Sequence, residues 1–248
     1  MIENRLKRID ELKARIDDFR PLDKSLLKQV REYFRIGLTY SSNALEGNSL
    51  TETETKVIIE DGITIGGKPL KDHYEAIGHS EAYDLLYRLA GKKEIREKHI
   101  KDLHKVFFFR IDPKNAGKYR KERVIITGSG FLPPSPNKVP ALMESLDQEI
   151  PALRKKYHPV HFAAFLHGEL VTIHPFIDGN GRTARLLMNL ALLQDGYPIA
   201  VIPPVLRTDY LDALKRSQKT PRDDRPFFDF IASVCYESAK EYLRLLEG

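Results

Sequence analysis

Apolar residues recur every three or four positions along most of the chain, which is the spacing of one face of an α-helix. Near the N-terminus, for example, Leu6, Ile9 and Leu12 are separated by charged residues, and Pro21 ends the pattern. The same periodicity predicts helices over about 6–19, 23–47, 51–62, 70–89, 96–109, 139–156, 159–173, 182–194, 208–217 and 226–246. We therefore expect a mainly α fold.

One short stretch follows a different pattern. Residues 123–127 are largely β-branched, and Gly128, Ser129 and Gly130 follow them before a further apolar pair. β-Branched side chains favour strands, and glycines favour the turn that joins two strands. The pattern therefore predicts a small β-hairpin at about 118–135, inserted between helices.

Composition narrows the class of protein. The 248 residues are 42% hydrophobic, which is enough for a substantial core and excludes wholesale disorder. No apolar run approaches the roughly 18–20 residues of a membrane span, and the charged N-terminal helix lacks a signal-type apolar stretch. Cys235 is the single cysteine, so we expect neither an internal disulfide nor a cysteine-based zinc site. These features predict a cytoplasmic protein without membrane association.

The excess of positive charge is concentrated in one segment. The chain carries 40 Lys and Arg against 35 Asp and Glu, a formal net charge of +5. Residues 114–123 hold five basic groups and one acid, so +4 of the excess lies there. Such a segment can bind phosphate or an acidic partner, or it can be a solvated loop. The overall excess is a weak indication of nucleic acid, and DNA binding is not expected.

A polar loop between two apolar helical segments is the part of the chain with the clearest chemistry. Gly179, Asn180 and Gly181 precede a helix start, where free N–H groups and the helix dipole favour an anion. Arg182 and Arg185 follow on the first helical turn and can flank the same anion with forked donors. The loop therefore predicts a phosphate-binding site.

Two more groups in this loop suggest what happens to the phosphate. Asp178 lies beside the anion-binding backbone, where a carboxylate can hold Mg²⁺ through its oxygens. His174 is the nearby group whose ordinary pKa suits a general base near neutral pH. The combination predicts a nucleotide-phosphate site with a metal and a base. It is not a P-loop, because the Gly-x-x-x-x-Gly-Lys-Ser/Thr pattern is absent from the sequence.

This loop resembles the motif of the Fic (filamentation induced by cAMP) family, HPFx(D/E)GN(G/K)RxxR. It matches at every defined position of 174–185, and residues 117–120 with the expected hairpin resemble the family's flap. The resemblance implies a mainly helical Fic-type domain that transfers AMP from ATP to a hydroxyl of a protein. It also implies that the flap, about 118–135, covers the site and holds the protein target by strand-like main-chain pairing.

The resemblance implies a role for each motif residue. His174 would be the general base that takes the proton of the attacking hydroxyl, Asp178 would be the metal ligand, and Phe176 would be a buried anchor. The backbone of Gly179, Asn180 and Gly181 would form the anion hole, and Asn180 would also contact phosphate. The nucleotide-binding residues implied by the motif are Asp178, Gly179, Asn180, Gly181, Arg182, Thr183 and Arg185. The family's flap and adenosine contacts would correspond to Thr127, Gly128, Ser129, Gly130, Tyr210, Leu214 and Gln218, although core packing explains Tyr210 and Leu214 equally well.

A second resemblance concerns the end of the helix predicted over 23–47. Ser42 and Glu46 match the family's inhibitory pattern, (S/T)xxxE(G/N), and lie on one helix face, with Gly47 suited to the position after its end. The resemblance implies that Glu46 pairs with Arg185 and withholds it from the γ-phosphate. Inhibition would then be intramolecular.

Residues 1–65 are expected to form an N-terminal helical extension that carries this inhibitory helix, and 66–248 the Fic core. The predicted function is a self-inhibited protein adenylyltransferase that uses ATP and Mg²⁺ and modifies Ser, Thr or Tyr of a target protein or of itself. A hydrolase that removes AMP and a non-enzymatic nucleotide-sensing regulator stay open as alternatives. A homodimer stays open as well, since dimers are common among the relatives.

Overall fold

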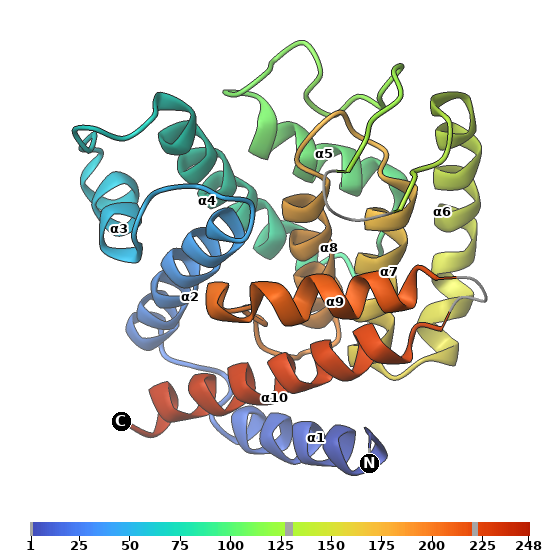
Figure 1. Cartoon of the computed structure of the whole chain (residues 1–248). Helices are drawn as coiled ribbons and strands as arrows, with labels where there is room; N and C mark the ends of the chain where they lie inside the picture. Colours follow the sequence, from blue (N-terminus) through green and yellow to red (C-terminus); the bar gives the residue numbers. More distant parts are fainter. Residues whose placement is uncertain (1, 127–130, 220–222) are drawn as a thin grey trace.

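The computed structural model describes residues 2–126, 131–219 and 223–248 (Figure 1). All the predicted helices are confirmed there, with ends that differ by a few residues. The helices are α1 (Ile2–Asp18), α2 (Lys24–Ala44), α3 (Glu52–Asp61), α4 (Leu70–Ala90), α5 (Glu97–Phe108), α6 (Val139–Lys156), α7 (Pro159–Ile173), α8 (Asn180–Gln194), α9 (Arg207–Ser217) and α10 (Arg225–Glu247). Short 3₁₀ turns, η1 (Pro136–Lys138) and η2 (Pro204–Leu206), precede α6 and α9.

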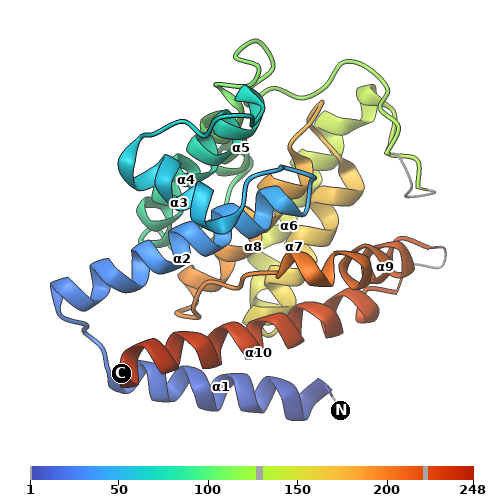
Figure 2. The ribbon, with the colours of Figure 1, turned by 60° about the vertical axis from the view of Figure 1, so that its left-hand side comes forward.

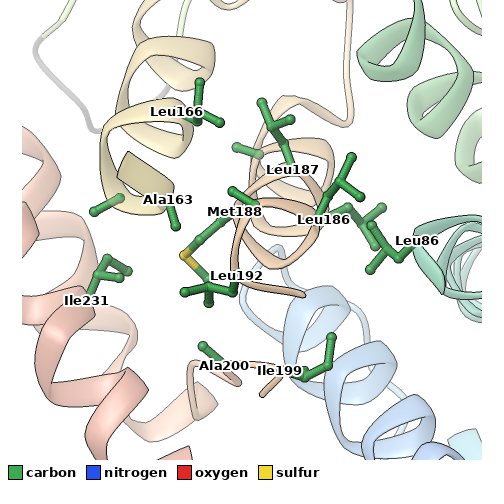
Figure 3. Packing of buried hydrophobic residues seen from close by; sticks show 14 of the residues in the cluster. Leu86, Ala163, Leu166, Leu186, Leu187, Met188, Leu192, Ile199, Ala200 and Ile231 are labelled. Carbon is green, nitrogen blue, oxygen red and sulfur yellow. The ribbon is translucent and has the colours of Figure 1, made fainter. Parts of the chain in front are cut away.

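Helix α8 lies at the centre of the molecule. It packs against α7, α4 and α5, while α6 and α10 pack against α7 from the other side (Figure 1). Figure 3 shows the side chains of α8 between Leu86 on one side and Ala163 and Ile231 on the other. Leu187 and Met188 of α8 are fully buried there. Because its faces are covered by neighbouring helices, α8 gives its first turn, where the predicted motif ends, a rigid support.

The N-terminal helices belong to the same hydrophobic core. Helix α1 runs alongside α10, and α2 then leads towards the first turn of α8 (Figure 2). Ile9 of α1 and Phe34 of α2 are buried in one cluster with the apolar residues of α8. Thr51 and Glu54 form a capping box at the start of α3. A domain boundary at about residue 65 stays a prediction.

The predicted β-hairpin is not seen. Residues 121–126 and 131–135 lie in neither helix nor strand, and 127–130 are outside the described residues. The side chain of Ile125, one of the β-branched residues of this segment, is 83% exposed and is not buried against a neighbouring element. Arg120 holds the two ends of the segment instead, because its guanidinium donates to the carbonyl oxygens of Glu122 at 3.1 Å and Pro134 at 2.5 Å.

None of the helices in the described ranges combines the length and the apolar character that crossing a bilayer requires.

Replacing a fully buried side chain of α8 should destabilise the whole fold. We predict that Leu187→Ala lowers the free energy of unfolding by about 3 kcal/mol, through lost burial and the cavity left behind. Val205→Ala is the matched control, because Val205 is 86% exposed and should change stability by less than about 0.5 kcal/mol. Urea unfolding followed by circular dichroism measures both, and equal losses for the two variants would contradict the central place of α8.

Candidate active site

The predicted motif forms the loop from the end of α7 to the first turn of α8. His174 ends α7 with φ 51° and ψ 58°, and its N–H donates to the carbonyl oxygen of Leu170 at 2.8 Å. Gly179 precedes α8 with φ 77°. A Cβ at this position would lie 2.8 Å from the ring of Phe107 on α5, so the close approach of the loop to α5 requires glycine.

Phe176 and Asn180 hold the loop in this shape. The ring of Phe176 is fully buried, as expected for an anchor, and stacks on His104 with the ring centroids 3.7 Å apart. The Asn180 amide accepts from the Phe176 N–H and donates to the Phe176 carbonyl oxygen, both at 2.9 Å. Both polar ends of the Asn180 side chain are therefore engaged by the loop itself, and its expected contact with phosphate stays a prediction.

His104 of α5 is a site residue that the motif does not predict. Its Nδ1 accepts from the N–H of Gly117 at 2.9 Å, so its Nε2 carries the proton and donates to the carbonyl oxygen of Asp178 at 3.0 Å. Burial lowers the pKa of His104 to about 4, which keeps the ring neutral, and the two hydrogen bonds select this tautomer. His104 thus joins α5, the segment leading to the flap and the motif loop.

Arg120 joins the flap segment to the motif loop. Its Nε donates to the carbonyl oxygen of His174 at 2.8 Å, and its backbone N–H donates to that of Pro175 at 2.9 Å. The side chain is buried. The bonds made by Arg120 therefore fix the backbone of the candidate catalytic histidine.

The carboxylate of Asp178 faces the start of α8 and is 49% exposed. One oxygen accepts from the N–H of Gly179 at 2.6 Å and lies 3.4 Å from Arg182, and the other lies 3.9 Å from Nζ of Lys71. The described residues contain no group of three or more His, Cys, Asp or Glu arranged to hold a metal. A half-exposed single carboxylate fits Mg²⁺, which commonly takes one or two carboxylates and completes its shell with substrate phosphates and water.

Arg185 is buried and bonded on every side. Its Nε donates to the hydroxyl of Ser42 at 2.9 Å, and its Nη2 donates to the Ser42 carbonyl oxygen at 2.8 Å and to the carboxylate of Glu46 at 2.7 Å. Its Nη1 donates to the hydroxyl of Tyr210 at 3.2 Å. The two residues of the second predicted pattern, Ser42 and Glu46, thus meet the last arginine of the first.

The Glu46 carboxylate lies against the first turn of α8. A Cβ at Gly181 would overlap one of its oxygens, so the glycine leaves the room that the carboxylate occupies. Burial raises the pKa of Glu46, but the charges of Arg185 and Arg182 lower it by more, and the net pKa is below its ordinary value. An ionised carboxylate of the chain itself therefore lies beside the start of α8, where the helix dipole favours an anion.

The three predicted adenosine contacts lie on α9 or directly after it. Tyr210 is buried, and its hydroxyl accepts from Arg185 and lies 3.1 Å from His167 Nε2. In this structure the Tyr210 hydroxyl therefore contacts Arg185. Leu214 and Gln218 line a cavity of about 20 Å³, and Gln218 donates to the hydroxyl of Thr172 at 3.2 Å. A cavity of that size is far smaller than a nucleoside.

The remaining predicted nucleotide contacts divide into two groups. Thr183 is fully buried, and its hydroxyl donates to the carbonyl oxygen of Gly179 at 2.9 Å, which stabilises the first turn of α8. Thr127, Gly128, Ser129 and Gly130 lie outside the described residues, so their proximity to a nucleotide stays a prediction.

The chain resembles proteins of known family over nearly its whole length. Residues 94–192 match the Fic/DOC family. The protein adenylyltransferase Fic of Drosophila willistoni is 35% identical over 244 residues, which cover 97% of this chain and 48% of that protein. A Fic domain containing signaling protein from Bacteroides thetaiotaomicron has a structure with a TM-score of 0.88 to this one, at 31% identity, covering 97% of this chain and 98% of that one. Fic-1 from C. elegans gives a TM-score of 0.87 at 29% identity, covering 99% and 72%.

The chain therefore belongs to the Fic family, which confirms the expectation from the motif. The chain spans about half the length of the curated relatives that it matches.

The amide of Asn180 should be needed for the stability of the motif loop. We predict that Asn180→Ala lowers the free energy of unfolding by about 2 kcal/mol, because it leaves the buried N–H and C=O of Phe176 without partners. Thermal unfolding measures the loss, and Asn4→Ala, on the exposed side of α1, is the control. Indistinguishable stability of the two variants would show that the loop is held by other contacts.

Proposed function

We propose that the chain is a protein adenylyltransferase that moves AMP from ATP to a Ser, Thr or Tyr hydroxyl of a protein, and that it inhibits itself. The observation that carries the proposal is the ion pair, 2.7 Å long, between the buried Arg185 of the Fic motif and Glu46 in the turn after α2. The reaction class is supported by the curated relatives, which are named protein adenylyltransferases.

In the proposed reaction, His174 is the general base. Its Nδ1 lies 3.3 Å from the carbonyl oxygen of Val171, so a proton on Nδ1 points there and Nε2 is left as the acceptor. Burial lowers the pKa of His174, which keeps the ring neutral at physiological pH. Nε2 takes the proton of the target hydroxyl while the hydroxyl oxygen bonds to the α-phosphorus, and the bond from that phosphorus to the leaving pyrophosphate breaks.

The start of α8 binds the phosphates in this proposal. Its free N–H groups and the positive end of the helix dipole face the anion, and Arg182 flanks it. Asp178, whose half-exposed carboxylate fits such a role, holds Mg²⁺. The metal supplies neutralisation of charge on the phosphates when it is bound.

Glu46 inhibits by occupying Arg185. The guanidinium of Arg185 is buried among Ser42, Glu46 and Tyr210, so a γ-phosphate can reach it only after Glu46 has left. The competition is between two anions for one cation, since the carboxylate already has the charge-assisted bond that phosphate would make. Relief of inhibition therefore requires the Glu46 carboxylate to leave Arg185.

One observation favours a second activity of the same site. The Glu46 side chain is 37% exposed, and the hydrogen bonds it makes within the described chain use only one of its two carboxylate oxygens. The other oxygen is available to orient a water molecule. A hydrolase that removes AMP from a modified protein would use Glu46 in this way.

Removal of the inhibitory carboxylate should release the transferase. We predict that Glu46→Gly raises incorporation of AMP from α-labelled ATP by about 10- to 100-fold, because a charge-assisted bond no longer competes with phosphate. Adding His174→Ala to this variant should reduce the rate by about 10²–10⁴-fold.

Intact-mass spectrometry identifies the adduct in the same samples. An AMP adduct on the Glu46→Gly protein or on an added protein supports the transferase. Equal labelling of wild type and Glu46→Gly would contradict self-inhibition, and a phosphate adduct would indicate a kinase. Release of AMP from a modified protein that depends on Glu46 would favour the hydrolase. If neither activity is detected, the nucleotide-sensing regulator is the remaining alternative.

The pH dependence of the released enzyme should report the lowered pKa of His174. The base form is present above the pKa of the folded protein and is lost as the pH falls through it, so we predict that kcat/KM of Glu46→Gly falls only below pH 6.5, the ordinary value. A profile of kcat/KM between about pH 5 and pH 9 measures the midpoint. A midpoint at or above the ordinary histidine value would exclude a buried neutral His174 as the base.

A further inference from the structure

A second carboxylate, Glu75, lies beside the motif arginines. It belongs to the second turn of α4 and is buried. One of its oxygens is 2.6 Å from Nη1 of Arg182 and 3.6 Å from Nζ of Lys71, and the other accepts from the side-chain amide of Asn48 at 2.9 Å. Both oxygens of the Glu75 carboxylate are therefore engaged.

Arg182 is fixed from three directions. Its Nη1 forms an ion pair with Glu75 of α4, although Nη1 and Nε have no hydrogen-bond partner in the described residues. The guanidinium lies 4.7 Å from the ring centre of Phe107 of α5 and 3.4 Å from the carboxylate of Asp178. The side chain is buried, so it has little freedom to search for a phosphate. Where it points is decided by these neighbours before any nucleotide arrives.

Glu75 and Glu46 differ in how firmly they are held. The Glu75 side chain is 6% exposed against 37% for Glu46, and Glu75 projects from the interior of a helix while Glu46 lies in the turn after α2. When Glu46 leaves Arg185, Glu75 stays as the counter-charge in a site with two buried arginines. Without it, Arg182 and Arg185 would lie close together with no buried anion to compensate them.

We propose that Glu75 is a positioning residue for phosphate binding: it holds the guanidinium of Arg182 beside the start of α8, in place for the phosphates of ATP. The inference rests on the proposed function, since it takes the phosphates to be those of ATP. It differs from the role of Glu46, which competes with phosphate for Arg185. Glu75 is the permanent partner of one arginine and Glu46 the displaceable partner of the other.

The direction of one effect separates positioning from competition. If Glu75 positions Arg182, removing its charge weakens the binding of ATP. If Glu75 competes with phosphate, as Glu46 is proposed to do, removing its charge tightens the binding of ATP. Glu75→Gln tests this, because glutamine keeps the size of the side chain and an oxygen that can accept from Asn48.

The test is a calorimetric titration of the 248-residue chain carrying Glu46→Gly and His174→Ala with ATP and Mg²⁺. This variant does not turn over in the proposed reaction. We expect Glu75→Gln to weaken binding about tenfold, through the loss of one buried ion pair. The same substitution should change binding less than about twofold in protein that also carries Arg182→Ala, because Glu75 acts through that arginine. Glu75→Asp, which keeps the charge, should recover part of the loss.

Glu81→Gln is the matched control. Glu81 also lies on α4, and it pairs with Arg110 at the surface, so its substitution should leave the affinity for ATP unchanged. Melting temperatures of all variants report whether they fold, and should Glu75→Gln unfold, the comparison of Glu75→Asp with the control carries the test.

Tighter or unchanged binding by Glu75→Gln would overturn the proposal, as would an equal loss with and without Arg182. Because the readout is binding, absence of AMP transfer by Glu46→Gly would count against the proposed function and not against this inference. Failure of the parent protein to bind ATP would contradict both.

Discussion

Arg185 is a cation buried between α2 and α8, and a buried cation requires partners that compensate its lost hydration. Ser42 and Glu46 supply most of them from a segment more than a hundred residues earlier in the chain. That requirement ties the N-terminal helices to the motif loop. It also places a carboxylate where the proposed nucleotide would bring its phosphates, so folding and the proposed inhibition depend on the same contact.

The contacts that hold the motif loop do not depend on the position of Glu46. Phe176 is stacked on His104, Asn180 is bonded to the Phe176 backbone, and Arg120 is bonded to the carbonyl oxygen of His174. None of these contacts involves the end of α2. The proposed base and the start of α8 are thus held by α5, α7 and the flap segment, and a movement of Glu46 need not disturb them.

The helices and the motif loop could be predicted because both are marked in the local sequence. Apolar periodicity marks the helices, and a short run of specific residues marks the loop. The contacts of His104, Arg120 and Glu75 could not be predicted. His104 meets Asp178 across 74 residues, and nothing in the local pattern of α5 marks it from other histidines. The hairpin was predicted from the β-branched residues of 123–127, but the described part of that segment forms no strand, and Ile125 is exposed.

The proposed inhibition depends on Glu46 keeping Arg185 from the γ-phosphate. Crystal structures of wild type and Glu46→Gly protein with ATP and Mg²⁺ test it most directly, through the distance from the Arg185 guanidinium to the γ-phosphate. We predict a hydrogen-bonded contact in Glu46→Gly, and in wild type the Arg185–Glu46 pair intact with the γ-phosphate out of hydrogen-bond reach. A γ-phosphate bonded to Arg185 in the wild type, with Glu46 still in place, would contradict the claim.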